Sequence, residues 1–256
     1  MSTIRHLINF MNSFSKSFLM KFDFYINSFD TAISYQSKIG LNRTELSSLT
    51  ELDQKLVQSY LSLAESSNTT AMGALRLLIS NFYSDAYSLI RILYEIACLM
   101  HYGNSTRENK IELYEVFYNS KLPEYEHQKK EWRLIKKSQS LFEKEKPGLI
   151  DVRKKLNSFG SHISRKKVVL GNMTALEESS TSTLFTDNSS NRYYLAGLEF
   201  THSMYVLILE EYAKHLQIYN GSTSNDIVEI RNLSSNFLKK IRPRLVNMVK
   251  NIGYLE

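Results

Sequence analysis

Two oppositely charged side chains stand out in the most apolar stretch of the sequence. Arg91 and Glu95 lie four residues apart within residues 71–102, which are otherwise rich in leucine, isoleucine and aromatic side chains. On a helix this spacing places both side chains on one face, where they can form an ion pair. In a structural interpretation the pair fixes the register of a buried helix, because a buried charge needs a partner. In a functional interpretation Arg91 binds an anion in a cleft and Glu95 orients Arg91.

His162 is a second candidate for chemistry. It follows a short run of small polar residues that begins at Asn157, and the cations Arg153 and Lys155 precede that run. Histidine titrates near neutral pH, so it can act as a general acid or base. Arg153, Lys155 and Asn157 are then candidate substrate-binding residues, because cations here would bind a phosphate and favour a neutral imidazole. The alternative is a hydrogen-bonded structural histidine at the end of a helix.

Several familiar kinds of site are excluded by the residue spacings. The six histidines show no HxxxH or HExxH pattern, and Cys98 is the only cysteine, so we expect no metal site. The chain has no glycine-rich phosphate loop, no dinucleotide fingerprint and no GxSxG elbow, and we expect no cofactor. These absences argue against the common nucleotide hydrolases, kinases, Rossmann enzymes and serine hydrolases.

The lone cysteine and the hydropathy both bear on location. Cys98 lies in the most apolar stretch, which predicts a buried, inert thiol and suits a reducing cytoplasm. No stretch of eighteen uncharged apolar residues occurs, so we expect no transmembrane helix and a cytoplasmic protein.

Positive charge is concentrated in two segments. Residues 121–167 carry 14 Lys and Arg against 6 Asp and Glu, and residues 231–250 carry 6 basic residues and no acidic one. Such segments can bind a phosphate-bearing partner such as RNA or a nucleotide. They can equally be the solvated faces of long helices.

The apolar spacing predicts an all-α protein, a bundle of about six to eight helices. Only nine glycines and three prolines interrupt the chain, so its elements must be long. Residues 71–102 repeat apolar side chains at intervals of three and four and are expected to form the buried central helix, preceded by a polar turn at 66–70. A highly charged helix is expected at 124–146, with Tyr125, Trp132, Ile135 and Phe142 as its buried side chains.

The predicted domain organisation is simple. Residues 1–220 form one helical bundle domain, in which the Ser/Thr/Asn-rich stretch 165–192 is a long mobile loop. Residues 221–256 form a basic C-terminal helical appendage. The first helix, 3–39, has a nearly heptad apolar seam that either pairs with a second copy of the chain or packs along its own bundle.

Two sequence runs resemble known families. SDAYSLIRILYEIACLMHY, which contains Arg91 and Glu95 in an LxRxLxE pattern, and the later LNSFGSHIS are similar to segments of an uncharacterised bacterial all-helical family. More distantly, the arrangement resembles the HEPN superfamily of helical bundles, many of which are metal-independent ribonucleases. The signature of that superfamily is an arginine followed, after four to six residues, by a histidine. In this sequence Asn157 and Lys155 stand at those spacings from His162, and Arg153 lies further away.

The resemblance implies a protein that binds or cleaves RNA, or a nucleotide, without a metal. His162 would be the general base, Arg91 and Lys155 would hold the phosphate, and Glu95 would orient Arg91. It also implies a homodimer or a partner protein, and a role in bacterial antiviral defence or toxin–antitoxin regulation. The alternative is a non-catalytic helical interaction or sensor subunit of a defence or regulatory complex.

Overall fold

The computed structural model describes residues 27–250 except 81, 120 and 161–187, and most of these residues are helical. No strand occurs among these residues, and the predicted all-α multi-helix bundle is confirmed. Residues 27–36 are helical, and the labelled helices that follow are α2 (Arg43–Ser47), α3 (Glu51–Ile79), α4 (Tyr83–Ser105), α5 (Arg107–Tyr118), α6 (Glu124–Glu145), α7 (Leu149–Gly160), α9 (Asn188–Gln217) and α10 (Ser224–Lys250).

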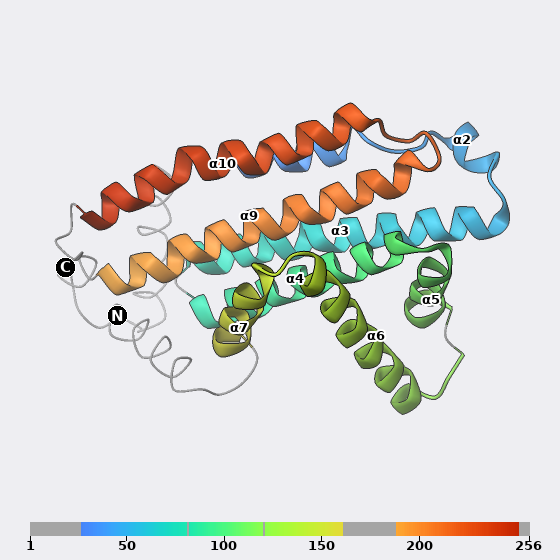
Figure 1. Ribbon diagram of the computed structural model, residues 1–256, viewed down its shortest axis with the longest axis horizontal. Helices are drawn as coiled ribbons and strands as arrows, with labels where there is room; N and C mark the ends of the chain where they lie inside the picture. The colour runs from blue at the N-terminus through green and yellow to red at the C-terminus, as the bar shows by residue number, and fades with distance from the viewer. Residues whose placement is uncertain (1–26, 81, 120, 161–187, 251–256) are drawn as a thin grey trace, which may run out of the picture.

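Helix α4 is the centre of the packing. It contacts α3, α5, α6, α7 and α9, whereas α10 packs against α9 (Figure 1). The long helices α3, α9 and α10 run side by side along the molecule, while α6 leaves the bundle at an angle and faces α5 across their connecting loop. The helices α5 and α6 therefore diverge from their connecting loop.

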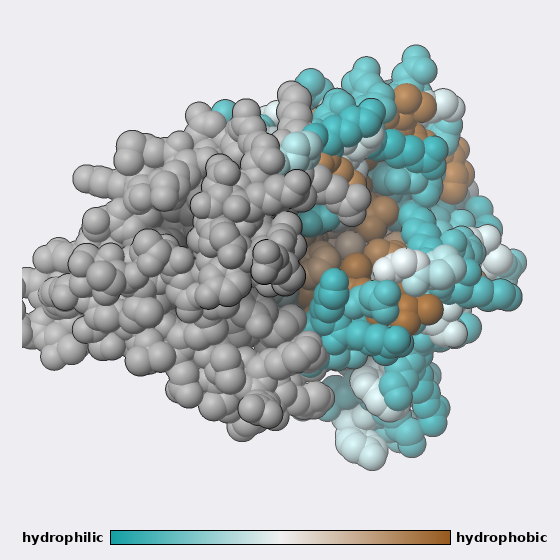
Figure 2. Space-filling view, turned by 60° about the vertical axis from the view of Figure 1, so that its left-hand side comes forward, coloured by the Kyte–Doolittle hydropathy of each residue, from teal (hydrophilic) through white to brown (hydrophobic). Residues whose placement is uncertain are grey.

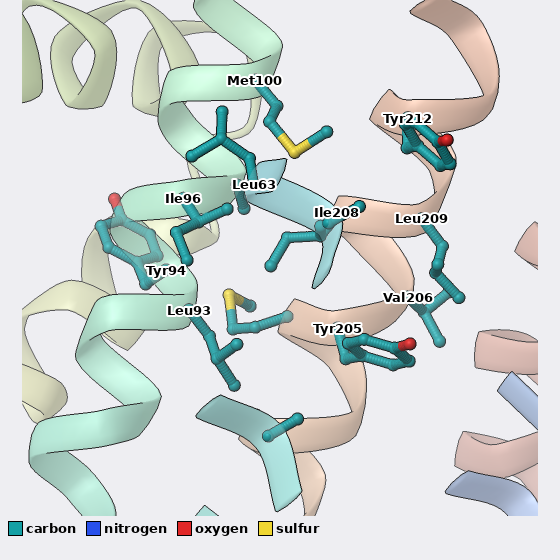
Figure 3. Close-up of a cluster of buried hydrophobic side chains, with 14 of the residues drawn as sticks. Leu63, Leu93, Tyr94, Ile96, Met100, Tyr205, Val206, Ile208, Leu209 and Tyr212 are labelled. Atoms are coloured by element: carbon teal, nitrogen blue, oxygen red, sulfur yellow. The ribbon is translucent and has the colours of Figure 1, made fainter. Parts of the chain in front are cut away.

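The core lies between α3, α4 and α9. Figure 3 shows Leu93, Ile96 and Met100 of α4 pointing toward Ile208 of α9 and Leu63 of α3. These side chains are at most 8% exposed. Burial of such side chains contributes roughly 1.5–3 kcal/mol each, and it is what holds the helices together.

The prediction of a single central helix over 71–102 is wrong, because these residues are divided between two helices. Residues 71–79 belong to the end of α3, and α4 begins only at Tyr83. The polar run at 66–70 is no turn but lies inside α3. Its hydroxyl groups bond to the carbonyls of the preceding turn: Ser67 donates to Ala64 (2.7 Å) and Thr70 to Ser66 (2.8 Å). Because the helix itself satisfies these polar groups, they do not interrupt it.

The two ends of the described chain pack onto the same bundle. In the helical residues 27–36, Phe29 of the predicted heptad seam is buried and Ile33 is partly buried against the core, so this part of the seam packs on its own chain. Helix α10, within the predicted C-terminal appendage, adds Ile230 and Phe237 to the common core. Most of the predicted loop 165–192 lies outside the described residues, and its last residues, from 188, begin α9.

Helix α6 is mostly exposed. Phe142 is fully buried, as expected, but Tyr125 and Trp132 are 76% and 57% exposed, so their predicted burial is wrong. The reason is that α6 contacts the bundle through one face only, and Leu134 rather than Trp132 lies on that face. The visible described surface in Figure 2 is mainly hydrophilic, with hydrophobic side chains gathered in smaller patches. In the part of the chain described here, no helix is long and apolar enough to cross a membrane.

Candidate functional site

A groove with more basic than acidic lining residues lies between α5 and α6. Its volume is about 470 Å³, and we call it the α5–α6 groove. Its charged lining residues are Glu112 and Glu115 from α5, Lys121 from the connecting loop, and Lys130, Arg133 and Lys137 from α6. Leu122, Val116 and Leu134 form its apolar floor and sides. The groove therefore joins an apolar base to a rim with four cations and two carboxylates.

Local sequence positions these side chains. Thr106 caps α5 by accepting a hydrogen bond from the Asn109 amide at 3.1 Å, and Pro123 directly precedes the first turn of α6. Lys130, Arg133 and Lys137 are spaced by three and four residues, so they share one face of α6. The rigid helices thus hold the cations in a row along one wall of the groove.

One of the four cations is neutralised within the protein. Lys137 Nζ lies 2.9 Å from Glu112 Oε2, and Glu112 also accepts a hydrogen bond from the Tyr102 hydroxyl. Hydrogen bonds with Tyr102 and Glu112 raise the pKa of Lys137. Burial acts to raise the pKa of Glu112, but its bonds from Tyr102 and Lys137 outweigh burial and hold that pKa below the usual value. This ion pair joins α5 to α6 within the lining of the groove.

The other three cations carry charge that the described chain does not balance. Among the described residues no carboxylate lies within ion-pair distance of Lys121, Lys130 or Arg133. Glu115 is the only other carboxylate in the lining. The open part of the groove is therefore positive, and it can bind an anion. Arg133 offers two parallel N–H donors to a phosphate, whereas the lysines act as point charges.

The predicted pair Arg91 and Glu95 forms, in a partly buried position. Arg91 Nε donates to Glu95 Oε1 at 3.0 Å, and the side chains are 32% and 21% exposed. Because water still reaches both groups, their desolvation costs less than that of a fully buried pair. Such a pair contributes only about 0.3–0.5 kcal/mol to stability.

Arg153 is engaged by a different carboxylate. Its guanidinium forms a two-bond contact with Glu143 of α6, with Nη2 at 3.2 Å from Oε2, and Glu143 also accepts from the Tyr94 hydroxyl at 2.6 Å. Cys98 lies beside this cluster and is fully buried, as predicted; burial raises the pKa of its thiol far above the usual value. The negative charge of Glu95 also acts to raise the pKa of that thiol. The structure thus gathers Glu95 and Arg153 around one inert thiol.

The remaining predicted site residues lie within α7 or beyond its end. Lys155 is exposed and Asn157 is partly buried on this helix. His162 lies outside the described residues, so its catalytic role stays a prediction. In the second basic segment, 231–250, Arg231 is bound to Glu210 at 2.8 Å, and most side chains beyond Lys239 lie outside the described part. No group of three or more potential metal ligands occurs among the residues described.

A polar network on the central helices was not anticipated from sequence. His101 of α4 places one ring nitrogen 3.1 Å from Glu211 and the other 2.9 Å from Glu145. Asn104 and Lys214 also donate to Glu211, whose side chain is 1% exposed. Burial acts to raise the pKa of Glu211, but these partners outweigh it and lower that pKa to about 2. Nothing in local spacing signals this contact, because His101 and Glu211 are 110 residues apart.

Comparison with known protein families, with curated proteins and with solved structures gives no match for this chain.

Proposed function

We propose that this protein binds RNA through the α5–α6 groove. The observation that carries the proposal is the set of three cations, Lys121, Lys130 and Arg133, that line the groove without a carboxylate partner in the described chain. A polyanion that occupies the groove would neutralise them and release its own counterions, which is the main source of affinity in such complexes. A single free phosphate would gain less, because it cannot contact a row of cations at once.

The groove favours binding over catalysis. Its lining contains no histidine or cysteine, and its two carboxylates are Glu112, held in an ion pair, and Glu115. The most common general base, histidine, is therefore absent from this lining. RNA binding without cleavage is also what the interaction or sensor-subunit alternative requires of this surface.

Binding is tested with a labelled twelve-nucleotide RNA by fluorescence anisotropy at several salt concentrations. We expect the Lys130→Ala/Arg133→Ala variant to bind more weakly, with a salt slope less negative by about 1.4, since each phosphate contact on a single strand contributes about 0.7. A matched control is Arg43→Ala/Arg76→Ala, which removes two exposed cations from α2 and α3, outside the groove. Equal losses in both variants would show nonspecific attraction and would contradict the proposal.

Cleavage is a separate hypothesis with its own experiment. If His162 is the general base, purified wild-type protein cleaves RNA in the presence of a chelator, and His162→Ala abolishes cleavage without changing the melting temperature. RNA binding by the groove should persist in this variant. Cleavage retained by His162→Ala would reject the catalytic role and leave the binding proposal untouched.

A further inference from the structure

The outer surface of α6 carries an aromatic side chain in an unusual setting. Trp132 is 57% exposed, and the ammonium group of Lys136 lies 3.6 Å from the centre of its ring. A tryptophan on a solvated helix face gains little from packing, so this one does little for the core of the bundle. An exposed indole beside a lysine can instead hold a flat aromatic group next to a negative charge.

The position of Trp132 links it to the α5–α6 groove. Lys136 is four residues after Trp132 and three after Arg133, so on the helix surface it neighbours both. Lys129, which is also exposed, stands three residues before Trp132 and four before Arg133. A continuous row of cations therefore leads from Arg133 in the groove, over Lys129 and Lys136, to the indole. Charge complementarity along this row fits a phosphate backbone that leaves the groove and crosses α6.

Tyr125 extends the same surface. It is 76% exposed and precedes Trp132 by seven residues, which is two helical turns or about 10 Å along the axis. Both aromatic rings thus lie on one face of α6, in the part of the chain where we had expected buried residues.

From this arrangement we infer that the protein prefers single-stranded RNA and that Trp132 stacks on one of its bases, an inference that rests on the proposed binding of RNA by the groove. Every base has a face that can stack on an indole, so the contact tolerates different sequences. In a duplex the bases are stacked on one another inside the helix, and their faces are not available to Trp132. The groove cations then bind the backbone of either form, while Trp132 distinguishes the unpaired strand.

The chain provides its own probe, because Trp132 is its only tryptophan. Unlabelled oligoadenylate or oligouridylate of twelve nucleotides is titrated into the protein while intrinsic fluorescence is recorded. Anisotropy of a labelled strand is measured in parallel, since it reports binding whether or not stacking occurs. We expect single strands to quench the fluorescence at the same concentration at which anisotropy rises, and a twelve-base-pair duplex to cause much weaker quenching.

Three variants separate stacking from charge. Trp132→Ala should weaken single-strand binding by about 5-fold to 100-fold, the range that corresponds to one stacked base, and leave duplex binding and the salt slope unchanged. Trp132→Phe keeps a flat ring and should recover part of the affinity. Val228→Ala removes an apolar side chain of similar exposure (51%) on α10 and should have no effect. A single-stranded DNA of the same length shows whether the ribose hydroxyl contributes.

The outcomes distinguish this inference from the function on which it rests. Binding by anisotropy without quenching, or equal affinity of Trp132→Ala and wild type for single strands, would overturn the stacking role and leave groove binding intact. Absence of any anisotropy change at low salt would overturn groove binding, and the stacking role with it. Quenching in the wild type, together with a loss of single-strand affinity in Trp132→Ala but not in Val228→Ala, would support both groove binding and the stacking role of Trp132.

Discussion

Gly103 of α4 leaves room for the side chain of Tyr60 of α3. Tyr60 is fully buried, its ring stacks on His215 with centroids 3.8 Å apart, and its hydroxyl donates to the Met100 carbonyl at 3.1 Å. A Cβ added at Gly103 would lie 2.2 Å from that hydroxyl oxygen. The absence of a side chain at Gly103 is therefore what lets the tyrosine reach the backbone of α4.

Replacing Gly103 by alanine should destabilise the fold by about 1–2 kcal/mol. The clash costs about 1–3 kcal/mol because the stacked ring cannot move aside, and alanine's better helix propensity recovers up to about 1 kcal/mol. Urea unfolding at pH 7 measures the difference. Gly148→Ala is the control, since a Cβ there would meet nothing within 4 Å.

A second substitution identifies the cause. Tyr60→Phe removes the oxygen that the new Cβ would meet, so Gly103→Ala should cost much less in a Tyr60→Phe background than in the wild type. A double-mutant cycle with no coupling between the two sites would show that the hydroxyl is not the obstacle.

At the scale of the helices, one network ties α4, α6 and α9 together. Glu211 is almost completely buried and accepts hydrogen bonds from His101, Asn104 and Lys214, while His101 reaches on to Glu145 near the end of α6. Removing Glu211 would leave these donors buried without their acceptor, which is costlier than losing an exposed pair. The network thus links the C-terminal end of α6 to α4 and α9.

The pH dependence of this network follows from the pKa of Glu211. In the folded state that pKa is about 2, below its ordinary value, so the charged carboxylate favours folding. Its contribution, on the order of 3 kcal/mol, is complete above about pH 4.5 and is lost as the pH falls toward 2. Glu211→Gln should therefore be much less stable than wild type at pH 7, and the difference in free energy of unfolding should shrink between pH 5 and 2. A difference that stays constant over this range would contradict the assignment. Glu65, which is exposed and forms no ion pair with the described residues, provides the control, and Glu65→Gln should change little.

The sequence located helices better than it located their contacts. Periodicity and the stop at Pro147-Gly148 predicted a helix at 124–146, and the structure has a helix at Glu124–Glu145. The two agree closely because the amphipathic pattern and the stop are both local. The prediction of a turn at 66–70 was wrong, because the hydroxyl groups of this run bond to carbonyls of their own helix. Trp132 looked buried because it is apolar; its exposure depends on whether a neighbour covers that side of α6, which no local pattern records.

The candidate site was predictable in charge but not in shape. The excess of cations in 121–167 was visible, and Lys121, Lys130 and Arg133 belong to it. The pairing of Lys137 with Glu112 could not be predicted, because it joins residues 25 positions apart on two different helices. Arg91 and Glu95 were correctly paired by their spacing, whereas the exposure of the pair follows from tertiary packing.

For the molecule as a whole, the position of α10 decides whether the chain behaves as one unit. Phe237 of α10 is 3% exposed, and its ring stacks on His202 of α9 with centroids 3.6 Å apart. His202 is itself fully buried, and burial lowers its pKa to about 3, so the stacked imidazole is neutral at physiological pH. This contact lies on the side of the bundle away from α6 (Figure 1).

Phe237→Ala should consequently lower the stability of the whole chain and leave its groove intact. Loss of a buried phenylalanine costs about 3 kcal/mol, which corresponds to a melting temperature lower by roughly 10 °C for a chain of this size. The melt, followed by far-UV circular dichroism, should remain a single transition, because α9 joins α10 to α4 and the common core. Val228→Ala, on the exposed side of α10, should leave the melting temperature unchanged. If residues 221–256 are instead an independent appendage, Phe237→Ala will melt a small helical fraction early and leave the main transition where it is. RNA affinity measured well below either transition should equal that of wild type, because the cations of the α5–α6 groove lie on α6 and its connecting loop, whereas α10 packs against α9.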